Sequence, residues 1–434
     1  MTDHPDIDEC IQEALSELES ADSVRRNGTH TYDIYLDILE RNLNREEYPF
    51  TKGEFEERLH RILVQSIGSE DPVETFHEQK ADLLRDVAIS EESEWTVLFP
   101  LELYQPPAIS IPQTLQCREV VVQNVRPNRM ENYESRFDDS NGVTERYQSF
   151  KDHKLSGGWN SDEWSFWKYN IKAQSADKAI RNAERDLEII LAKMNLALIS
   201  EKYPTIPEVG HNIVGGLDPE GVVSPICFLL FGQGDEAKFK LGWNLFPRSP
   251  QPIPEGWKSN VESYPDFSAG HPLDESILPA LRAFQQGQAA NEYDSRFLNY
   301  WRGIESANTF RTDDNIKTER KVDRATTFMY GIDLELLEYR MEKIRKKRNE
   351  LVHQAAGPDI YMQDINFLKR VLVNEISGLF ELRDRDEKNK HPERAQNIMD
   401  RGRSGEDDIQ DEIDRLQNEQ EKLRAVLDWR DRVL

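Results

Sequence analysis

The stretch Lys343-Ile-Arg-Lys-Lys-Arg-Asn-Glu-Leu-Val-His353 gives the strongest signal for the fold of this 434-residue chain. Five of the six residues from Lys343 to Arg348 are basic, although the chain has a formal net charge of −26. Arg348 also lies on the apolar stripe of a predicted helix, so its guanidinium requires a partner or a ligand. The stripe has the steps of three and four residues that are typical of an amphipathic helix, and it consists of Leu334, Leu337, Met341, Ile344 and Leu351.

Two motifs point to a known family. Arg348 and His353 form an Arg-x4-His pattern that also contains Asn349. Upstream, the segment Arg296-Phe-Leu-Asn-Tyr-Trp-Arg-Gly-Ile-Glu305 has an aromatic-Trp-x3-Glu pattern. Together the motifs resemble those of HEPN domains, small helical bundles found in many prokaryotic RNases and toxins of defence systems. The upstream segment resembles the first helix of the ApeA-like branch, and the resemblance covers residues 274–382, about a quarter of the chain.

The resemblance implies a helical bundle that forms a symmetric dimer, with the two motifs lining one cleft. In this arrangement His353 is the acid or base and Arg348 holds the phosphate, while Glu305 pairs with Arg348 or positions it. Asn349 lies one helical turn before His353 and is expected to orient its imidazole. No cofactor and no metal ion are expected. Contacts to the RNA backbone are expected from four further cations, Lys343, Arg345, Lys346 and Lys347.

The residue types of the motif suit RNA cleavage without a metal ion. This reaction needs a base for the 2′-hydroxyl, an acid for the leaving 5′-oxygen and positive charge at the phosphorus. An imidazole titrates near neutrality and serves as acid or base, and a guanidinium stays charged and binds phosphate oxygens in pairs. One Arg and one His per chain supply these roles most easily when two chains bring their motifs together. The expected product is a 2′,3′-cyclic phosphate end.

Two functions therefore stay open. The first is a HEPN-type endoribonuclease of antiviral defence or abortive infection, with RNA as substrate. Its N-terminal modules restrain the nuclease or sense a trigger molecule or a partner protein. The alternative is a non-catalytic HEPN module that binds RNA or a partner in a defence or regulatory complex. On that interpretation Arg348 and Glu305 form a structural ion pair and His353 caps the helix end or packs near it. The basic run is then a solvated face near a helix C-terminus, where cations are favoured.

Composition sets the broad class of the protein. The 81 acidic and 55 basic residues argue against nonspecific binding of nucleic acid or anionic membranes by the whole surface, and they give the chain a halophile-like balance. Cys10, Cys117 and Cys227 are far apart and lack CxxC spacing, so no disulfide framework or zinc site is predicted. The longest apolar run, 226–231, is too short for a bilayer, and the acidic N-terminus is unlike a signal peptide. These features predict a cytoplasmic protein without membrane contact.

We predict a multi-domain α+β fold with five successive segments. Changes in periodicity, the position of prolines and the charge pattern set the boundaries. The segments are an N-terminal helical region (1–92), a central α+β module with a mostly antiparallel sheet (93–246), a Pro-rich linker (247–272), an all-α HEPN-like bundle (273–382), and a charged segment with a short coiled-coil-like helix (383–434).

Local signals place elements within these segments. Asp71-Pro72 is a helix start, because Pro is favoured at the first helical position, and Ser175 is expected to cap a helix that runs to about residue 199. The polar stretch 127–161 is predicted to be a long exposed loop or the tip of a hairpin. Strands are predicted at 95–99, 119–122, 164–171, 224–231 and 239–246.

The last segment has its own pattern. Beyond residue 382 the chain is highly charged until Ile409, after which apolar residues step at 4, 3, 7 and 4, with Gln420 at the skipped position. This spacing resembles a short coiled coil with a polar break. Such a helix either associates with a second copy or docks on the protein's own helices. Its apolar residues are Ile409, Ile413, Leu416, Leu423 and Leu427.

Overall fold

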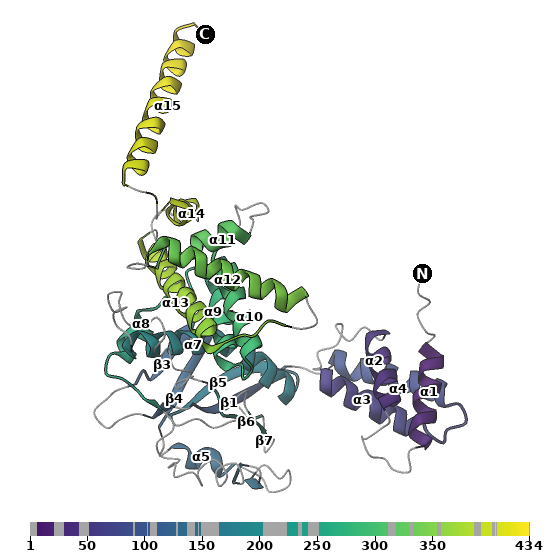
Figure 1. Ribbon diagram of the computed structural model, residues 1–434. Coiled ribbons are helices and arrows are strands. Elements are labelled where there is room, and N and C mark those ends of the chain that lie inside the picture. Colours follow the sequence, from purple (N-terminus) through teal and green to yellow (C-terminus); the bar gives the residue numbers. More distant parts are fainter. Residues whose placement is uncertain are drawn as a thin grey trace. The chain divides into compact units, whose positions relative to one another are not determined.

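The chain is a mixed α and β protein whose elements are labelled in Figure 1. In the computed structural model, contacts divide it into two compact units that interleave along the sequence, unlike the five successive segments predicted above. The first unit is Met1–Leu101, Val121–Leu187 and Pro225–Gly242, and the second is Glu102–Val120, Glu188–Ser224 and Trp243–Leu434. The structure describes residues 7–20, 30–42, 52–89, 92–101, 103–104, 111–126, 129–136, 144–145, 147–148, 165–202, 224–232, 237–241, 251–310, 318–329, 333–353, 357–385, 392–401, 404 and 406–433.

Four helices of the first unit pack around one apolar core. They are α1 (Ile7–Ser20), α2 (His30–Asn42), α3 (Lys52–Ser66) and α4 (Pro72–Ile89). Apolar residues recur every three or four positions along α1, which contacts each of the other three helices. Helix α4 begins where the sequence predicts, because the Asp71 carboxylate accepts a hydrogen bond of 3.0 Å from the backbone N–H of Glu74.

Five strands of the first unit form an antiparallel sheet, as predicted. They are β1 (Ser93–Leu101), β4 (Val120–Val125), β5 (Ser165–Ala173), β6 (Cys227–Phe231) and β7 (Ala237–Leu241). Their order across the sheet is β4-β5-β1-β6-β7, and Val97 of β1 lies opposite Tyr169 of β5 and Leu230 of β6. Strand β1 is central and covered on both faces, which explains its nearly continuous apolar sequence.

The two faces of this sheet are covered differently. Helix α7 (Ala176–Lys202) begins after Ser175, whose hydroxyl accepts a hydrogen bond of 3.1 Å from the Lys178 N–H, as predicted. It approaches the face of Tyr169, whose hydroxyl donates a hydrogen bond of 3.1 Å to Asp186. The opposite face holds an apolar cluster that includes Met130, beside the short helix α5 (Glu131–Glu134), and Tyr147. The prediction of an exposed loop at 127–161 is wrong at these two residues, and most of that stretch lies outside the described residues.

The second unit contains a helical bundle. Its helices are α9 (Asp274–Ala289), α10 (Tyr293–Ala307), α11 (Thr318–Ala325), α12 (Leu334–His353) and α13 (Met362–Arg385). Helix α10 contacts the other four. It approaches α13 closely at Gly303, where a Cβ atom would lie 2.6 Å from the side chain of Leu372. The C-terminal half of α7 also belongs to this unit, and Asn195 donates a buried hydrogen bond of 2.7 Å to Gln285 of α9.

The Pro-rich linker predicted at 247–272 is packed structure where it is described, from residue 251 onward. Trp257 and Phe267 are buried there, and the Trp257 indole donates a hydrogen bond of 3.0 Å to the carbonyl of Met194 on α7. The prolines mark turns, but the buried aromatic side chains fix the segment to the bundle. The short elements of the second unit are α8 (Trp257–Ser263), β3 (Thr114–Cys117), and the parallel pair β2 (Leu103–Tyr104) and β8 (Gln251–Pro252).

Two further helices follow the bundle, α14 (Pro392–Arg401) and α15 (Glu406–Val433). Ala395 and Met399 of α14 are buried, and α14 contacts α11. Nearly all the described side chains of α15 are exposed, including its large apolar ones. Among the helices of the described residues, none has the length and apolar character needed to span a membrane.

Candidate functional site

The Arg-x4-His motif occupies the last turns of α12, which forms over the predicted range. Asp333 caps the helix, because its carboxylate accepts a hydrogen bond of 3.0 Å from the Leu336 N–H. Leu334 at the start of the helix is exposed, the stripe is buried over the middle of the helix, and it reaches the surface again at Arg348, which is partly buried. The helix ends at His353. The buried residues of the stripe are Leu337, Met341 and Ile344.

Arg348 is held by the predicted partner on α10. Its Nη2 lies 3.7 Å from Oε1 of Glu305, and the two side chains are 29% and 26% exposed. An ion pair this accessible to water contributes only about 0–1 kcal/mol to stability. The pair directs the guanidinium toward α10 and leaves donors available to a ligand, because Arg has five N–H groups.

Asn349 and His353 are both exposed. The Asn349 side-chain oxygen accepts a hydrogen bond of 3.3 Å from Nη1 of Arg348, so Asn349 supports the arginine in this structure, whereas the prediction assigned it to the imidazole. Arg348 and His353 are five residues apart on one helix, which places them about 7.5 Å apart along the axis and about 140° apart around it. The two side chains of one chain therefore leave the helix in different directions.

Lys347, predicted to contact RNA, instead fastens the start of α13. Its Nζ lies 2.7 Å from the carboxylate of Asp364 and donates a hydrogen bond of 2.7 Å to the carbonyl of Asp359. Asp364 is 6% exposed and also accepts a hydrogen bond of 3.0 Å from Arg340. The ammonium further lies 4.7 Å from the ring centroid of Tyr361. Lys347 is thus engaged by groups of its own chain. Its main partner, Asp364, was not indicated by local sequence patterns.

The other predicted RNA-binding cations differ in how far they are engaged. Arg345 donates two hydrogen bonds, of 2.7 and 3.0 Å, to the carboxylate of Glu342. These bonds lower the pKa of Glu342, and Lys346 lies 3.8 Å from the same carboxylate. Lys343 is exposed, with Nζ 4.5 Å from the ring centroid of Tyr339. Lys343 and Lys346 therefore present most of the positive charge that this face offers to a phosphate.

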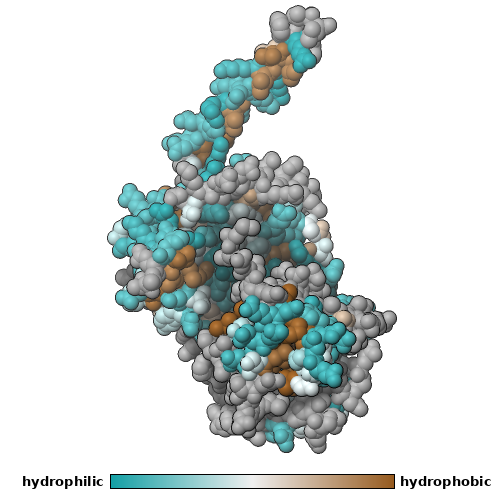
Figure 2. All heavy atoms as spheres, turned by 90° about the vertical axis from the view of Figure 1, so that its right-hand side faces the viewer, coloured by the Kyte–Doolittle hydropathy of each residue, from teal (hydrophilic) through white to brown (hydrophobic). Residues whose placement is uncertain are grey.

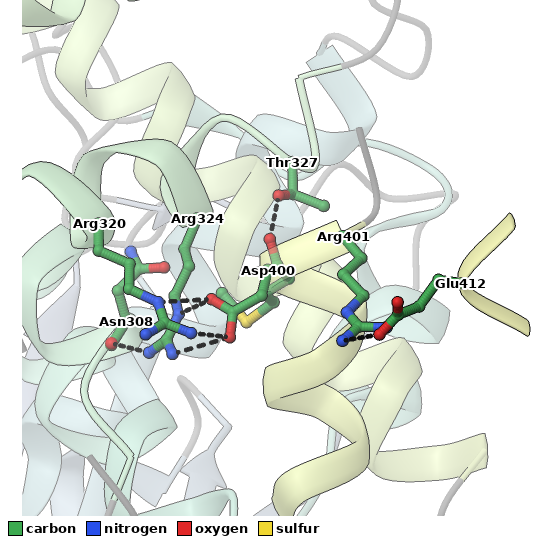
Figure 3. A network of polar contacts seen from close by, with 8 residues as sticks. Asn308, Arg320, Arg324, Thr327, Asp400, Arg401 and Glu412 are labelled. Atoms are coloured by element: carbon green, nitrogen blue, oxygen red, sulfur yellow. Dashed lines mark hydrogen bonds and ion pairs between the residues drawn. The ribbon is translucent and has the colours of Figure 1, made fainter. Parts of the chain in front are cut away.

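A second polar network, unnoticed in the sequence, lies where α14 meets α11 (Figure 3). The side chain of Arg324 is 1% exposed and donates hydrogen bonds of 2.6 and 3.2 Å to the Asp400 carboxylate and of 3.0 Å to the backbone carbonyl of Asn308. Arg320 adds two more to Asp400, of 3.2 and 2.7 Å. The Thr327 hydroxyl donates a hydrogen bond of 2.8 Å to the carbonyl of Met399. A cavity of about 280 Å³ adjoins this network.

The network ends in a buried acid. The side-chain amide of Asn308 donates a hydrogen bond to the carboxyl group of Glu375, a residue of α13 that is fully buried. Burial raises the pKa of Glu375 well above its usual range, although the Asn308 hydrogen bond acts in the opposite direction. The raised pKa favours the neutral form of this carboxyl group, and its burial makes it inaccessible to a substrate.

One group of carboxylates among the described residues has the geometry of a cation site. Oxygens of Asp37, Glu40 and Glu56 lie within 4.8 Å of one another on α2 and α3. Each of these residues also takes part in other polar interactions, and none of them belongs to the unit that carries α12.

The structure thus joins Arg348, Glu305 and Asn349 directly and places His353 at the end of the same helix. It assigns Lys347 to an internal ion pair. Comparison with known proteins adds no relative to this description, because no protein-family model, no curated protein and no solved structure matches the chain.

Proposed function

We propose that this protein is a HEPN-type endoribonuclease that cuts RNA without a metal ion, in antiviral defence or abortive infection. The observation that carries the proposal is the pairing of Arg348 with Glu305 on a helix that ends in an exposed His353. The guanidinium is oriented and still accessible, and the imidazole is free to meet a phosphodiester. Those are the two groups that this chemistry requires.

The reaction would proceed by transfer within the RNA. The 2′-oxygen loses its proton to one imidazole and attacks phosphorus, while the bond from phosphorus to the 5′-oxygen breaks. The leaving 5′-oxygen takes a proton from a second imidazole, and a 2′,3′-cyclic phosphate remains. Arg348 would neutralise the charge that grows on the phosphorus-bound oxygens.

A second chain would supply the missing groups. Each chain brings one His353, and its own Arg348 leaves α12 about 140° away around the helix axis. If two bundles pack together through the C-terminal ends of their α12 helices, the histidine of one copy would lie near the arginine of the other. This is the homodimer that the motif resemblance implies.

RNA binding at this site would be modest in strength. The protein carries a net charge of −26, and Arg345 and Lys347 are engaged by carboxylates of the same chain. The salt dependence of binding rises with the number of phosphates that cations neutralise. A small contact set centred on Arg348, Lys343 and Lys346 would give a shallow salt dependence, and the N-terminal region would have to restrain or direct the enzyme through a trigger or a partner protein.

A non-catalytic HEPN module that binds RNA or a partner protein is the second candidate. The internal pairing of the basic run favours it, since Arg348, Arg345 and Lys347 all contact carboxylates of their own chain. On this alternative the Arg348–Glu305 pair stabilises the bundle and His353 is a surface residue. The cleavage assay separates the two candidates.

The test is cleavage of end-labelled RNA in EDTA by the wild type, His353→Ala and Arg348→Ala, at low and high salt. The exposed Arg302 of α10 offers a matched control in Arg302→Ala. Loss of cyclic-phosphate products in both motif variants, with circular dichroism and the control unchanged, is the expected result. RNA binding by all four proteins without cleavage, in the presence of candidate triggers, would favour the non-catalytic module.

A further inference from the structure

Helix α15 presents an apolar stripe that the described part of the chain leaves exposed. The stripe is visible as a line of brown residues along the helix in Figure 2. Five large apolar side chains on it are between 40% and 61% exposed. They are Ile409, Ile413, Leu416, Leu423 and Leu427.

The spacing of this stripe is that of a coiled coil. With Gln420 included, the positions 409, 413, 416, 420, 423 and 427 alternate between steps of four and three. This is a heptad repeat with Ile413, Gln420 and Leu427 at a and with Ile409, Leu416 and Leu423 at d. A stripe with a period of 3.5 residues stays on one side of a supercoiled helix, where it fits a second helix of the same kind better than the flat side of a bundle.

We propose that α15 pairs with α15 of a second copy of this chain in a parallel, in-register, two-stranded coiled coil. The proposal concerns a different surface from the Arg-x4-His motif and stands whether or not the protein cuts RNA. Two features of the seam select this partner and this direction, the amide at Gln420 and the charges that flank it.

Gln420 favours the parallel arrangement. In a parallel, in-register pair, the residue at a faces the same residue of the partner, so two Gln420 amides meet and each can donate to and accept from the other. In an antiparallel pair, a packs against d. The register that keeps the other layers apolar then sets Gln420 against Leu416 of the second copy, which buries an amide without a partner at a cost in stability.

The flanking charges favour the same direction. Glu419 lies at g and Arg424 at e of the next heptad, and these are the positions that face each other across a parallel pair. Two attractive contacts between Glu419 and Arg424 result, one on each side. The antiparallel register described above would instead place Glu419 opposite Glu419 of the partner.

The acidic first half of α15 is compatible with this arrangement. Asp407, Asp408, Asp411 and Asp414 occupy b, c and f positions, which point away from the seam and are exposed. Their repulsion acts through water and is screened by salt. At the g position, Glu412 is already engaged by its own chain, by Arg415 at 2.7 Å and by Arg401 of α14 at 3.2 Å.

Cross-linking of the full-length chain tests both the pairing and its direction. Ile409→Cys and Leu427→Cys are oxidised separately and as a mixture, with the wild type as a control because its three cysteines are buried. Parallel pairing gives a disulfide-linked dimer with each variant alone and no mixed dimer. A cross-link that forms only in the mixture would overturn the direction, and failure of every sample to cross-link would overturn the pairing.

A charge test separates this contact from any dimer formed by the bundle. In the Ile409→Cys background, Leu416→Glu with Leu423→Glu should abolish the cross-link. Asn418→Glu with Ala425→Glu adds the same charge at outward f positions and should leave the cross-link intact. Equal cross-linking by both pairs would refute a seam at these leucines. A ribonuclease assay on the same proteins can fail without affecting this result.

Discussion

Lys347 and Asp364 form an ion pair of 2.7 Å that joins the last half of α12 to the first turn of α13. The carboxylate is buried and receives Arg340 as well. Lys347 therefore stabilises the bundle, whereas the exposed Lys343 and Lys346 of the same basic run can bind an anion.

Lys347→Met should destabilise the bundle by about 1–3 kcal/mol, because Asp364 loses one of its two cationic partners in a place with little water. Lys343→Met removes an exposed charge and should change stability by less than about 0.5 kcal/mol. Denaturant unfolding measures both values. RNA affinity should fall for Lys343→Met and stay near the wild-type value for Lys347→Met. If Lys347→Met lowered the RNA affinity and Lys343→Met did not, Lys347 would have to be counted among the RNA-binding residues.

Glu305→Gln should leave stability within about 1 kcal/mol of the wild type, because the ion pair is partly exposed. If Arg348 is a phosphate-binding group positioned by Glu305, the cleavage rate should drop by roughly tenfold to a hundredfold, since a small displacement of a catalytic group is costly. Single-turnover cleavage and thermal unfolding are measured on the same preparation. A rate equal to that of the wild type would mean that Arg348 needs no support from α10.

Glu375→Gln should stabilise the protein near neutral pH. Burial raises the pKa of Glu375 in the folded protein above the value of about 4.3 that an unfolded chain has. The folded state therefore binds the extra proton in the window between the two pKa values. The free energy of unfolding falls as pH rises through that window, by at most about 1.4 kcal/mol per pH unit. The free energy of unfolding, measured from pH 4 to 8, should depend less on pH in the variant, and an unchanged slope would contradict a raised pKa of Glu375.

Asp400→Ala should destabilise the protein by about 3–5 kcal/mol, because it leaves the buried guanidinium of Arg324 without its carboxylate. The matched control is Arg320→Ala, which removes the more exposed arginine of the same network and should cost about 1 kcal/mol or less. Urea unfolding gives both values, and limited proteolysis should cut near α14 in the first variant alone. A similar decrease in the free energy of unfolding in both variants would show that the burial of Arg324 does not increase the contribution of its ion pair.

Local patterns in the sequence were sufficient to place many elements. The stripe from Leu334 to Leu351 predicted α12, and Ser175 and Asp71 predicted where α7 and α4 begin. Alternating apolar residues indicated the main strands. These features depend on neighbours within a few positions, so a single sequence is enough to find them.

Pairings between distant residues could not be found in this way. Arg324 and Asp400 are 76 positions apart, and no local sequence pattern predicts that they form a buried ion pair. Trp257 lies between prolines in a stretch that is typical of a linker, and neither its burial nor its hydrogen bond to Met194 of α7 could be predicted from those neighbours. The partner of Lys347 was missed for the same reason. The Arg348–Glu305 contact was predicted only because a family resemblance named both residues.

Neighbouring residues of α14 hold partners on opposite sides, since Asp400 turns to α11 and Arg401 to Glu412 of α15 (Figure 3). Mechanically, this makes α14 a coupling link. A load applied to α15 would act first on the exposed Arg401–Glu412 contact and then on the buried arginine clamp around Asp400. The weaker contact would give way first, and the load would then pass along the backbone into α14, where the buried arginine clamp at Asp400 would resist it.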